Sequence, residues 1–79
     1  MILHQRITDD GLELTVYRMI FNDRICVGEP GAPTYERAFC FPQDGSAIVA
    51  AERWDGEGDP PGPWIKESGT DRYRVPPQF

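Results

Sequence analysis

The sequence predicts an α+β fold, in which one helix packs on one face of an antiparallel sheet of three to four strands. Two hairpin signals, Asp10-Gly11 and Asn22-Asp23, divide residues 1–28 into runs rich in β-branched, aromatic and aliphatic side chains. After Pro42 the apolar residues recur at helical spacing instead. We therefore expect a sheet within 2–41, a helix over 45–54, a loop over 55–63 and an extended tail over 64–79.

The two turn signals set the register of a three-stranded meander near 2–8, 12–21 and 24–28. If each is a two-residue turn, Ile7 lies opposite Leu14 and Ile20 lies opposite Ile25. A one-residue slip would destroy the single apolar face that results. The predicted apolar face is Leu3, Ile7, Leu12, Leu14, Val16, Ile20, Ile25 and Val27. The predicted opposite face is mixed and is Ile2, His4, Arg6, Thr8, Glu13, Thr15, Tyr17, Met19 and Cys26.

Residues 35–41 predict a fourth strand at the edge of the sheet. Their alternation places four side chains on one side, namely Tyr35, Arg37, Phe39 and Phe41. The composition of 28–33 predicts a loop before this strand.

The helix predicted over 45–54 rests on the helical spacing of Ala47, Ile48, Ala51 and Trp54. Asp44 can cap its start, and Gly56 can end it in a left-handed conformation. A strand over 47–53 is the competing interpretation, less favoured because three alanines favour a helix. After the loop over 55–63, we expect Trp64 and Ile65 to pin the chain back onto the core.

Length and charge bound what the chain can do. Its 79 residues are one domain's worth of chain, 1–79. The net charge of −5 repels phosphate backbones and anionic membranes, and it favours a basic partner over direct contact with nucleic acid. The alternative is that the acidity serves only solubility.

The sequence predicts no cofactor, no metal and no catalytic activity. Structural zinc needs about four Cys or His ligands, and the chain has one histidine and two isolated cysteines. Asp55, Glu57 and Asp59 alternate like the opening of a calcium loop, but Lys66 stands where the closing glutamate belongs. The thiol and imidazole combination on offer is Cys26 or Cys40 with His4, and whether the two cysteines approach each other is left open.

Composition also predicts the compartment. No apolar run reaches the roughly 20 residues that span a bilayer. The start of the chain has no charged segment followed by an apolar stretch, and two cysteines do not make a dense disulfide framework. We therefore expect a cytoplasmic protein with no membrane partner.

Acidic residues gather around the two predicted turns and after the predicted helix. Spaced carboxylates on a rigid scaffold can stand in for the phosphates of a nucleic acid and occupy a channel lined by Lys and Arg. The alternative is that turns and helix ends are simply polar. Trp54 or Trp64 could add an apolar anchor. The predicted partner-binding residues are Asp9, Asp10, Glu13, Asp23, Glu52, Asp55, Glu57, Asp59 and Trp64.

Four segments, FNDRICVG, YERAFCF, AAERWDGEGDPPGPWIK and DRYR, follow one another in an order that resembles short accessory proteins of phages and prophages in high-GC bacteria. The resemblance covers about residues 20–74 and rests mainly on Trp54-Asp55-Gly56 and Trp64. The chain departs from it at Pro63, which precedes the tryptophan, and in having Phe39 and Phe41 around Cys40. The resemblance implies an accessory protein of a mobile element.

Short acidic proteins of that kind are similar to anti-CRISPR inhibitors, including those that bind a type I effector complex and block target DNA. We therefore expect a phage-encoded inhibitor, monomeric in the host cytoplasm, that binds a basic surface of a host protein or ribonucleoprotein complex. A phage structural or assembly component that self-associates through a sheet edge is the alternative. An enzyme that uses Cys26 or Cys40 is the third interpretation.

Overall fold

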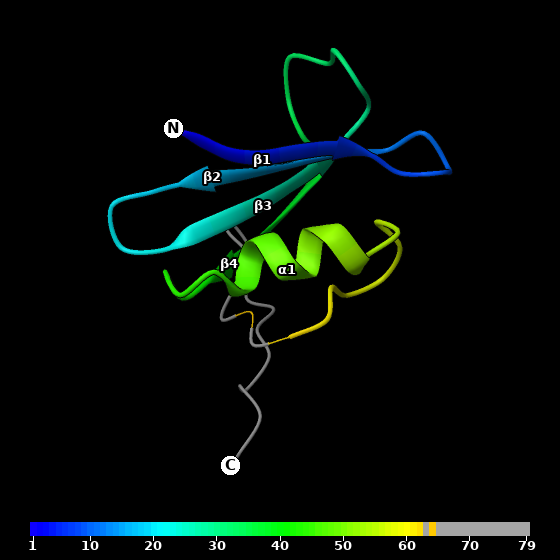
Figure 1. Cartoon of the computed structure of the whole chain (residues 1–79). Helices are drawn as coiled ribbons and strands as arrows, with labels where there is room; N and C mark the ends of the chain where they lie inside the picture. The colour runs from blue at the N-terminus through cyan, green and yellow to red at the C-terminus, as the bar shows by residue number, and fades with distance from the viewer. Residues whose placement is uncertain (63, 65–79) are drawn as a thin grey trace.

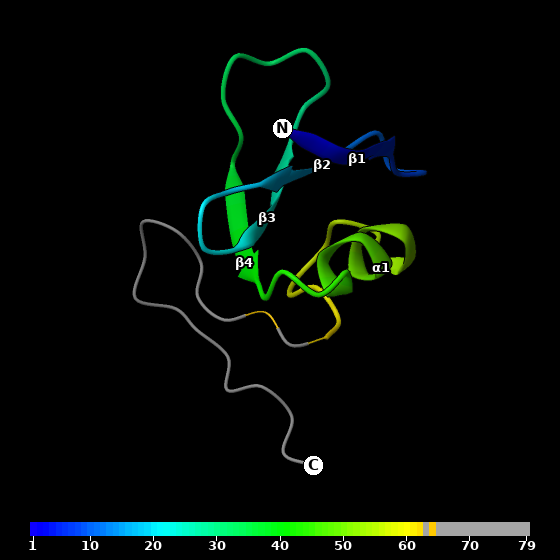
Figure 2. The same cartoon turned by 60° about the vertical axis from the view of Figure 1, so that its left-hand side comes forward.

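A computed structural model describes residues 1–62 and 64 of the chain. Four strands form one antiparallel sheet in chain order, and they are β1 (Ile2–Ile7), β2 (Glu13–Arg18), β3 (Asp23–Gly28) and β4 (Arg37–Phe41). A single helix in the described part of the chain, α1 (Ser46–Arg53), lies across one face and contacts every strand (Figure 1 and Figure 2). The predicted α+β fold is confirmed. The helix spans the predicted range to within one residue at each end.

The turn between β1 and β2 has three residues, Asp9 to Gly11, and not the predicted two. The N–H of Thr8 donates to the carbonyl of Leu12 at 2.8 Å, and the N–H of Gly11 donates to the carbonyl of Thr8 at 2.9 Å. Gly11 has φ of 86°, the left-handed residue that a type I turn followed by a bulge requires. A two-residue turn of type I′ would have needed positive φ at Asp10 as well.

This longer turn shifts the register of β1 by one residue. Arg6 lies opposite Leu14 and His4 lies opposite Val16, where the two-residue turn predicted Ile7 and Gln5. The inward positions of β1 are therefore polar, and Ile7 is exposed on the other face. A bulge between Ile2 and His4 lets Leu3 still pack against the core.

The turn between β2 and β3 lies two residues earlier than predicted. Met19 donates its N–H to the carbonyl of Asn22 at 2.9 Å, so Ile20 and Phe21 form the tip. The predicted pairing is displaced by an even number of residues, and Val16 lies opposite Ile25. The predicted face of β2 and β3 is thus retained, but Ile20 leaves it for solvent.

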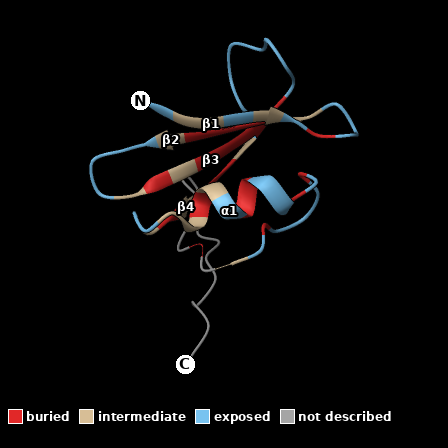
Figure 3. Ribbon diagram, viewed as in Figure 1, coloured by how far each residue is buried: buried red, intermediate tan, exposed pale blue. Residues whose placement is uncertain are grey.

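The core lies between the inner face of the sheet and α1 (Figure 3). Phe39 from β4 contacts Trp54 and Trp64 edge to face, with ring centroids 5.4 Å apart in both pairs. Trp64 therefore packs in the core, as predicted. Ile65 and the tail over 65–79 lie outside the described residues. The core side chains are Leu14, Val16, Ile25, Val27, Phe39, Phe41, Ala47, Ala50, Ala51, Trp54 and Trp64.

The residues that cap the two ends of α1 differ from the predicted ones. The carboxylate of Asp44 accepts the N–H of Ser46 at 2.9 Å, while Gly45 occupies the N-cap position with no side-chain bond. At the other end the C-cap is Trp54, whose backbone is extended. Gly56 has φ of 88° but lies two residues further on, so it turns the following loop and does not end the helix. The fourth strand is shorter than the predicted range 35–41. β4 begins at Arg37, so Tyr35 lies before it and is exposed.

Candidate functional site

Three connections of the chain meet at one end of the sheet. Ile7, Glu13 and Gly28 lie side by side across β1, β2 and β3, and Arg37 pairs with Val27 at the same end. The turn over 8–12, the loop over 29–36 and the segment that follows α1 therefore start from the same end of the sheet, although the loop over 29–36 rises on the side away from α1 (Figure 1 and Figure 2). This end collects residues that are far apart in the sequence.

Arg6 fastens the end of α1 to the sheet. Its Nη1 donates to the carbonyl oxygens of Ala51 at 3.1 Å and Trp54 at 2.9 Å. These carbonyls lie at the end of the helix, where no following turn supplies N–H donors to them. The helix dipole also favours a cation near this end. The guanidinium therefore caps the helix from a strand 45 and 48 residues earlier in the chain.

Arg37 holds the loop that follows. Its Nη1 donates to the carbonyl of Gly58 at 2.9 Å, and its Nη2 donates to the carbonyl of Gly56. The same guanidinium lies 5.6 Å from the centre of the Trp54 ring, within the range of a cation–π contact. The indole N–H of Trp54 in turn donates to the carbonyl of Glu57 at 2.8 Å.

Gly56 brings this loop against the β1–β2 turn. A Cβ built on Gly56 would lie 2.8 Å from Cδ1 of Leu12, closer than side chains approach. The absence of a side chain there lets the loop after α1 and the turn over 8–12 touch. Arg6, Arg37 and Gly56 together join two acidic segments into one surface.

We call this surface the acidic end. Most of its side chains are exposed, whereas Glu13 is half-buried. Of the predicted binding residues it holds Asp9, Asp10, Glu13, Glu52, Asp55, Glu57 and Asp59. The prediction missed two exposed carboxylates in the loop over 29–36, Glu29 and Glu36, and Glu29 lines a pocket with Glu13 and Cys26 on the face of the sheet away from α1.

Two predicted binding residues do not belong to this surface. Asp23 is 0% exposed, and its Oδ1 accepts from Nε of Arg18 at 2.6 Å in an ion pair at the opposite end of the sheet. Trp64 is 2% exposed and packs in the core, and Trp54 is 5% exposed. These side chains stabilise the fold from inside, so their assignment to a partner surface is wrong.

Glu29 and Glu36 could have been placed from the sequence. In a meander, alternate connections lie at the same end of the sheet, so the loop after β3 must share an end with the turn before β2. The positions of Arg6 and Arg37 carried no such signal. Their contacts join residues 19 to 48 positions apart through backbone carbonyls, which no side-chain pattern reveals.

The thiol and imidazole groups do not form a catalytic pair. His4 lies opposite Val16 and shares the inner face, while Cys26 lies opposite Thr15 on the outer face. Burial raises the pKa of Cys26 to about 11, a shift that nearby Arg24 opposes and Cys40 reinforces. Cys26 and Cys40 share the outer face on neighbouring strands, and both are free thiols.

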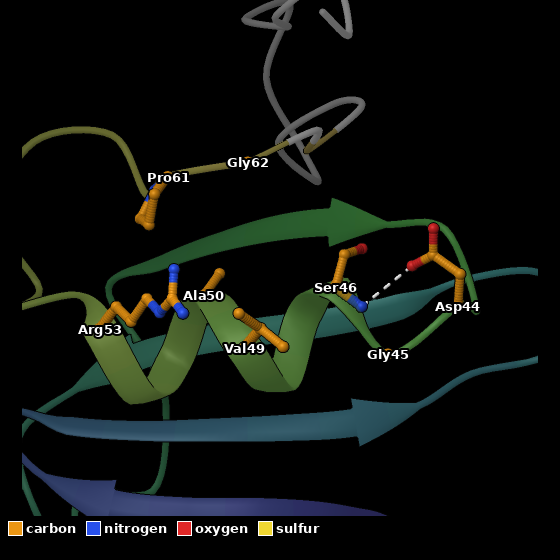
Figure 4. A pocket seen from close by; sticks show the side chains of 8 residues that line it. All are labelled: Asp44, Gly45, Ser46, Val49, Ala50, Arg53, Pro61 and Gly62. Atoms are coloured by element: carbon orange, nitrogen blue, oxygen red, sulfur yellow. Dashed lines mark hydrogen bonds between the residues drawn. The ribbon is translucent and has the colours of Figure 1, made fainter.

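A pocket of about 430 Å³ opens between α1 and the segment 61–62 (Figure 4). Asp44 and Arg53 line its two ends, and Val49 and Ala50 lie between them. Its charged groups do not converge on one point, and the Asp44 carboxylate already accepts from Ser46. Among residues 1–62 and 64, no group of three or more His, Cys, Asp or Glu side chains could hold a metal ion.

Comparison of the chain with protein-family models, with curated proteins and with solved structures gives no match. No helix in the described part of the chain is long and apolar enough to cross a membrane. The fold and the site therefore define a small α+β protein with a fastened, strongly acidic end.

Proposed function

We propose that the chain is a non-catalytic inhibitor, which binds a basic, nucleic-acid-binding surface of a partner through its acidic end. The observation that carries this proposal is the joining of two acidic segments, 9–13 and 52–59, at one end of the sheet by Arg6 and Gly56. Neither segment alone offers more than the polarity expected of a turn.

The hydrogen bonds within the two acidic loops support this function. Asp55 Oδ1 accepts the N–H of Glu57 at 2.9 Å, and Thr8 Oγ1 accepts the N–H of Leu12 at 3.1 Å, so both loops are internally bonded. A preorganised surface loses little conformational entropy on binding. Complementary charge also steers association and raises its rate. Carboxylates carried on two internally bonded loops can therefore compete with phosphates for a Lys- and Arg-lined groove.

The partner that we propose is a type I CRISPR effector complex, whose binding of target DNA the protein blocks in the host cytoplasm. This assignment rests on the resemblance to phage accessory proteins together with the acidic end. The protein acts without turnover, without a cofactor and without contacting nucleic acid itself. Its contact with the complex is electrostatic, so its affinity falls as the salt concentration rises.

Binding of target DNA by a purified type I complex, measured at excess inhibitor, tests the proposal. The informative variant carries Asp9→Asn, Asp10→Asn and Glu57→Gln, which keep the turn chemistry and remove three charges. We expect a loss of inhibition of about tenfold or more. The control carries Asp44→Asn and Val49→Lys on exposed positions outside the acidic end, and it should inhibit normally. Full DNA binding at excess wild-type protein would overturn the proposal.

The alternative function is a phage structural or assembly component that self-associates through a sheet edge. The sheet has two edge strands, β1 and β4. The bulge between Ile2 and His4 interrupts the regular pairing on β1, and such bulges protect an edge against a further strand.

A further inference from the structure

A second pocket opens on the outer face of the sheet, the face away from α1. Its cavity of about 90 Å³ lies between β2, β3 and the loop over 29–36, which rises on this side in Figure 2. Glu13, Thr15 and Tyr17 alternate along β2, so all three share the outer face and line the cavity. Cys26 lies opposite Thr15 on β3 and lines it as well. We call this cavity the outer pocket.

One wall of the outer pocket is a loop whose backbone is restricted. The N–H of Ala32 donates to the carbonyl of Glu29 at 3.1 Å, and the two residues between them are Pro30 and Gly31. Gly31 has φ of 77°, as the third residue of a type II turn requires, and proline is common at the second position. This turn holds Glu29 at the outer pocket, which it lines.

The same loop rests directly on β3. The N–H of Glu36 donates to the carbonyl of Val27 at 2.7 Å, which closes the loop at its base. A Cβ built on Gly28 would lie 3.1 Å from the Cα of Tyr35, so the absence of a side chain at Gly28 lets the backbone of the loop approach the strand. A pocket with its wall held in this way is formed before a ligand arrives, which lowers the entropy cost of binding.

The charge of the outer pocket favours a cation. The charged side chains that line it are both glutamates, Glu13 and Glu29. Within residues 1–62 and 64, neither of them forms an ion pair with an arginine or a lysine. Arg24 shares the outer face, but it lies opposite Tyr17 and Cys40 and does not line the pocket. Two carboxylates without a counter-charge therefore border one small cavity, which attracts positive groups.

The size of the outer pocket and its aromatic lining select the kind of cation. A volume of about 90 Å³ is well below the roughly 300 Å³ at which small-molecule sites begin, so the end of one side chain fits and a nucleotide does not. Tyr17 and Tyr35 line the pocket and supply ring surface on which a guanidinium can stack. The fork of N–H donors on a guanidinium also matches carboxylates better than an ammonium does.

We propose that the outer pocket binds the guanidinium group of an arginine side chain that a partner protein presents. That this arginine belongs to a nucleic-acid-binding surface rests on the proposed function, whereas the selectivity of the pocket for a guanidinium does not. Glu13 belongs both to the acidic end and to the outer pocket. The pocket therefore adds one directional contact at the margin of a surface that otherwise attracts its partner by charge.

Titration of the isotope-labelled protein with Nα-acetylarginine amide, followed by amide chemical shifts at constant ionic strength, tests the proposal. A single small group binds weakly, so we expect a dissociation constant of about 1 to 10 mM. The shifts should be largest at Glu13, Cys26 and Glu29. Nα-acetyllysine amide should bind about threefold more weakly or worse, because an ammonium gains less from the tyrosine rings and the two carboxylates.

Substitutions separate the outer pocket from the general acidity of the chain. Glu13→Gln with Glu29→Gln removes both charges of the pocket and should weaken binding of the arginine amide about tenfold or more. The matched control, Asp9→Asn with Asp55→Asn, removes two charges from exposed residues that do not line the pocket, and it should bind within about twofold of the wild type. Tyr35→Leu, at a position that is 47% exposed, should narrow the difference between the arginine and lysine amides.

Three results would each overturn the proposal: equal affinity for the two amides, binding that survives the double substitution of the glutamates, or shifts confined to 52–59. The titration contains no partner protein, so its outcome does not depend on the inhibitory function. A protein that blocks DNA binding but does not distinguish the two amides would keep the proposed function and lose the arginine site. A protein that selects the arginine amide but leaves DNA binding intact would do the reverse.

Discussion

The guanidinium of Arg6 on β1 lies 2.9 Å from the carbonyl oxygen of Trp54, at the end of a helix 48 residues further along the chain. This contact and the one to Ala51 satisfy carbonyls that the helix itself leaves without donors. The same side chain therefore caps α1 and fixes where the acidic loop after the helix begins. Arg6 therefore contributes both to stability and, with Arg37 and Gly56, to the layout of the acidic end.

We expect Arg6→Met to destabilise the protein by about 2 kcal/mol, because hydrogen bonds from a charged donor are lost and two carbonyls are left without partners. Chemical denaturation followed by circular dichroism measures the change. Arg6→Lys supplies a charge without the fork of donors, so it should cost less than Arg6→Met. Equal stability of Arg6→Met and the wild type would show that the contact does not cap the helix.

The sequence predicted the strands and the helix more successfully than it predicted the turns and the register between the strands. Leu14, Val16, Ile25 and Val27 were assigned to the apolar face, and all are buried. The predicted register of β1 is wrong by one residue because Asp10-Gly11 fits a two-residue turn as well as the end of a three-residue turn. In the structure only Gly11 of this pair has positive φ, which selects the three-residue turn. The β2–β3 turn was misplaced because Ile20 and Phe21 occupy the tip in place of typical turn residues.

The sequence predicted most of the carboxylates of the acidic end, but it did not predict which contacts bring them together or which carboxylate is buried. Seven of its carboxylates were named from the sequence because they flank turn and helix-end signals. Asp23 carries the same signal, yet it pairs with Arg18 and is buried. What separates it from Asp9 is a partner across the strand pair, and a turn signal contains no information about partners.

The ion pair between Arg18 and Asp23 yields an asymmetric prediction. Asp23 is 0% exposed, whereas the Arg18 side chain is 42% exposed. Arg18→Met leaves a buried carboxylate without its counter-charge and should cost about 3 kcal/mol or more. Asp23→Asn leaves an arginine that can turn to water, so it should cost less. Thermal denaturation of the two variants compares them, and the reverse order of stability would contradict the assignment.

Two glycines after α1 give a matched pair of substitutions. Gly58 has φ of 63° and open space around it, so Gly58→Ala should cost only the left-handed strain of about 1 kcal/mol. Gly56 has φ of 88°, and its Cβ would lie 2.8 Å from Cδ1 of Leu12, so Gly56→Ala adds the displacement of this side-chain end to the same strain and should cost more than Gly58→Ala. Adding Leu12→Ala to Gly56→Ala should relieve the clash and leave a coupling energy between the two positions. Additive effects in this double-mutant cycle would show that the loop and the turn do not touch.

The buried thiol of Cys26 predicts both reactivity and a pH dependence of stability. Burial raises its pKa from 9.0 to about 11, so at pH 8 the folded protein carries about a hundredfold less thiolate there than an unperturbed cysteine. Iodoacetamide should therefore alkylate half-buried Cys40 well before Cys26 in the native state, and both equally in denaturant. Mass spectrometry of the time course measures the order.

The same raised pKa fixes the sign of the stability change. Because the folded state keeps the Cys26 proton to a higher pH than the unfolded state, this contribution to stability is complete below pH 9 and is lost as the pH rises towards 11. Cys26→Ala should lose this dependence, whereas Cys40→Ala should keep it. Unfolding by urea at a series of pH values between 8 and about 11 resolves the difference, after the lysine- and tyrosine-dependent background shared by all three proteins is subtracted. Identical profiles for the wild type and Cys26→Ala would show that the thiol is already open to solvent.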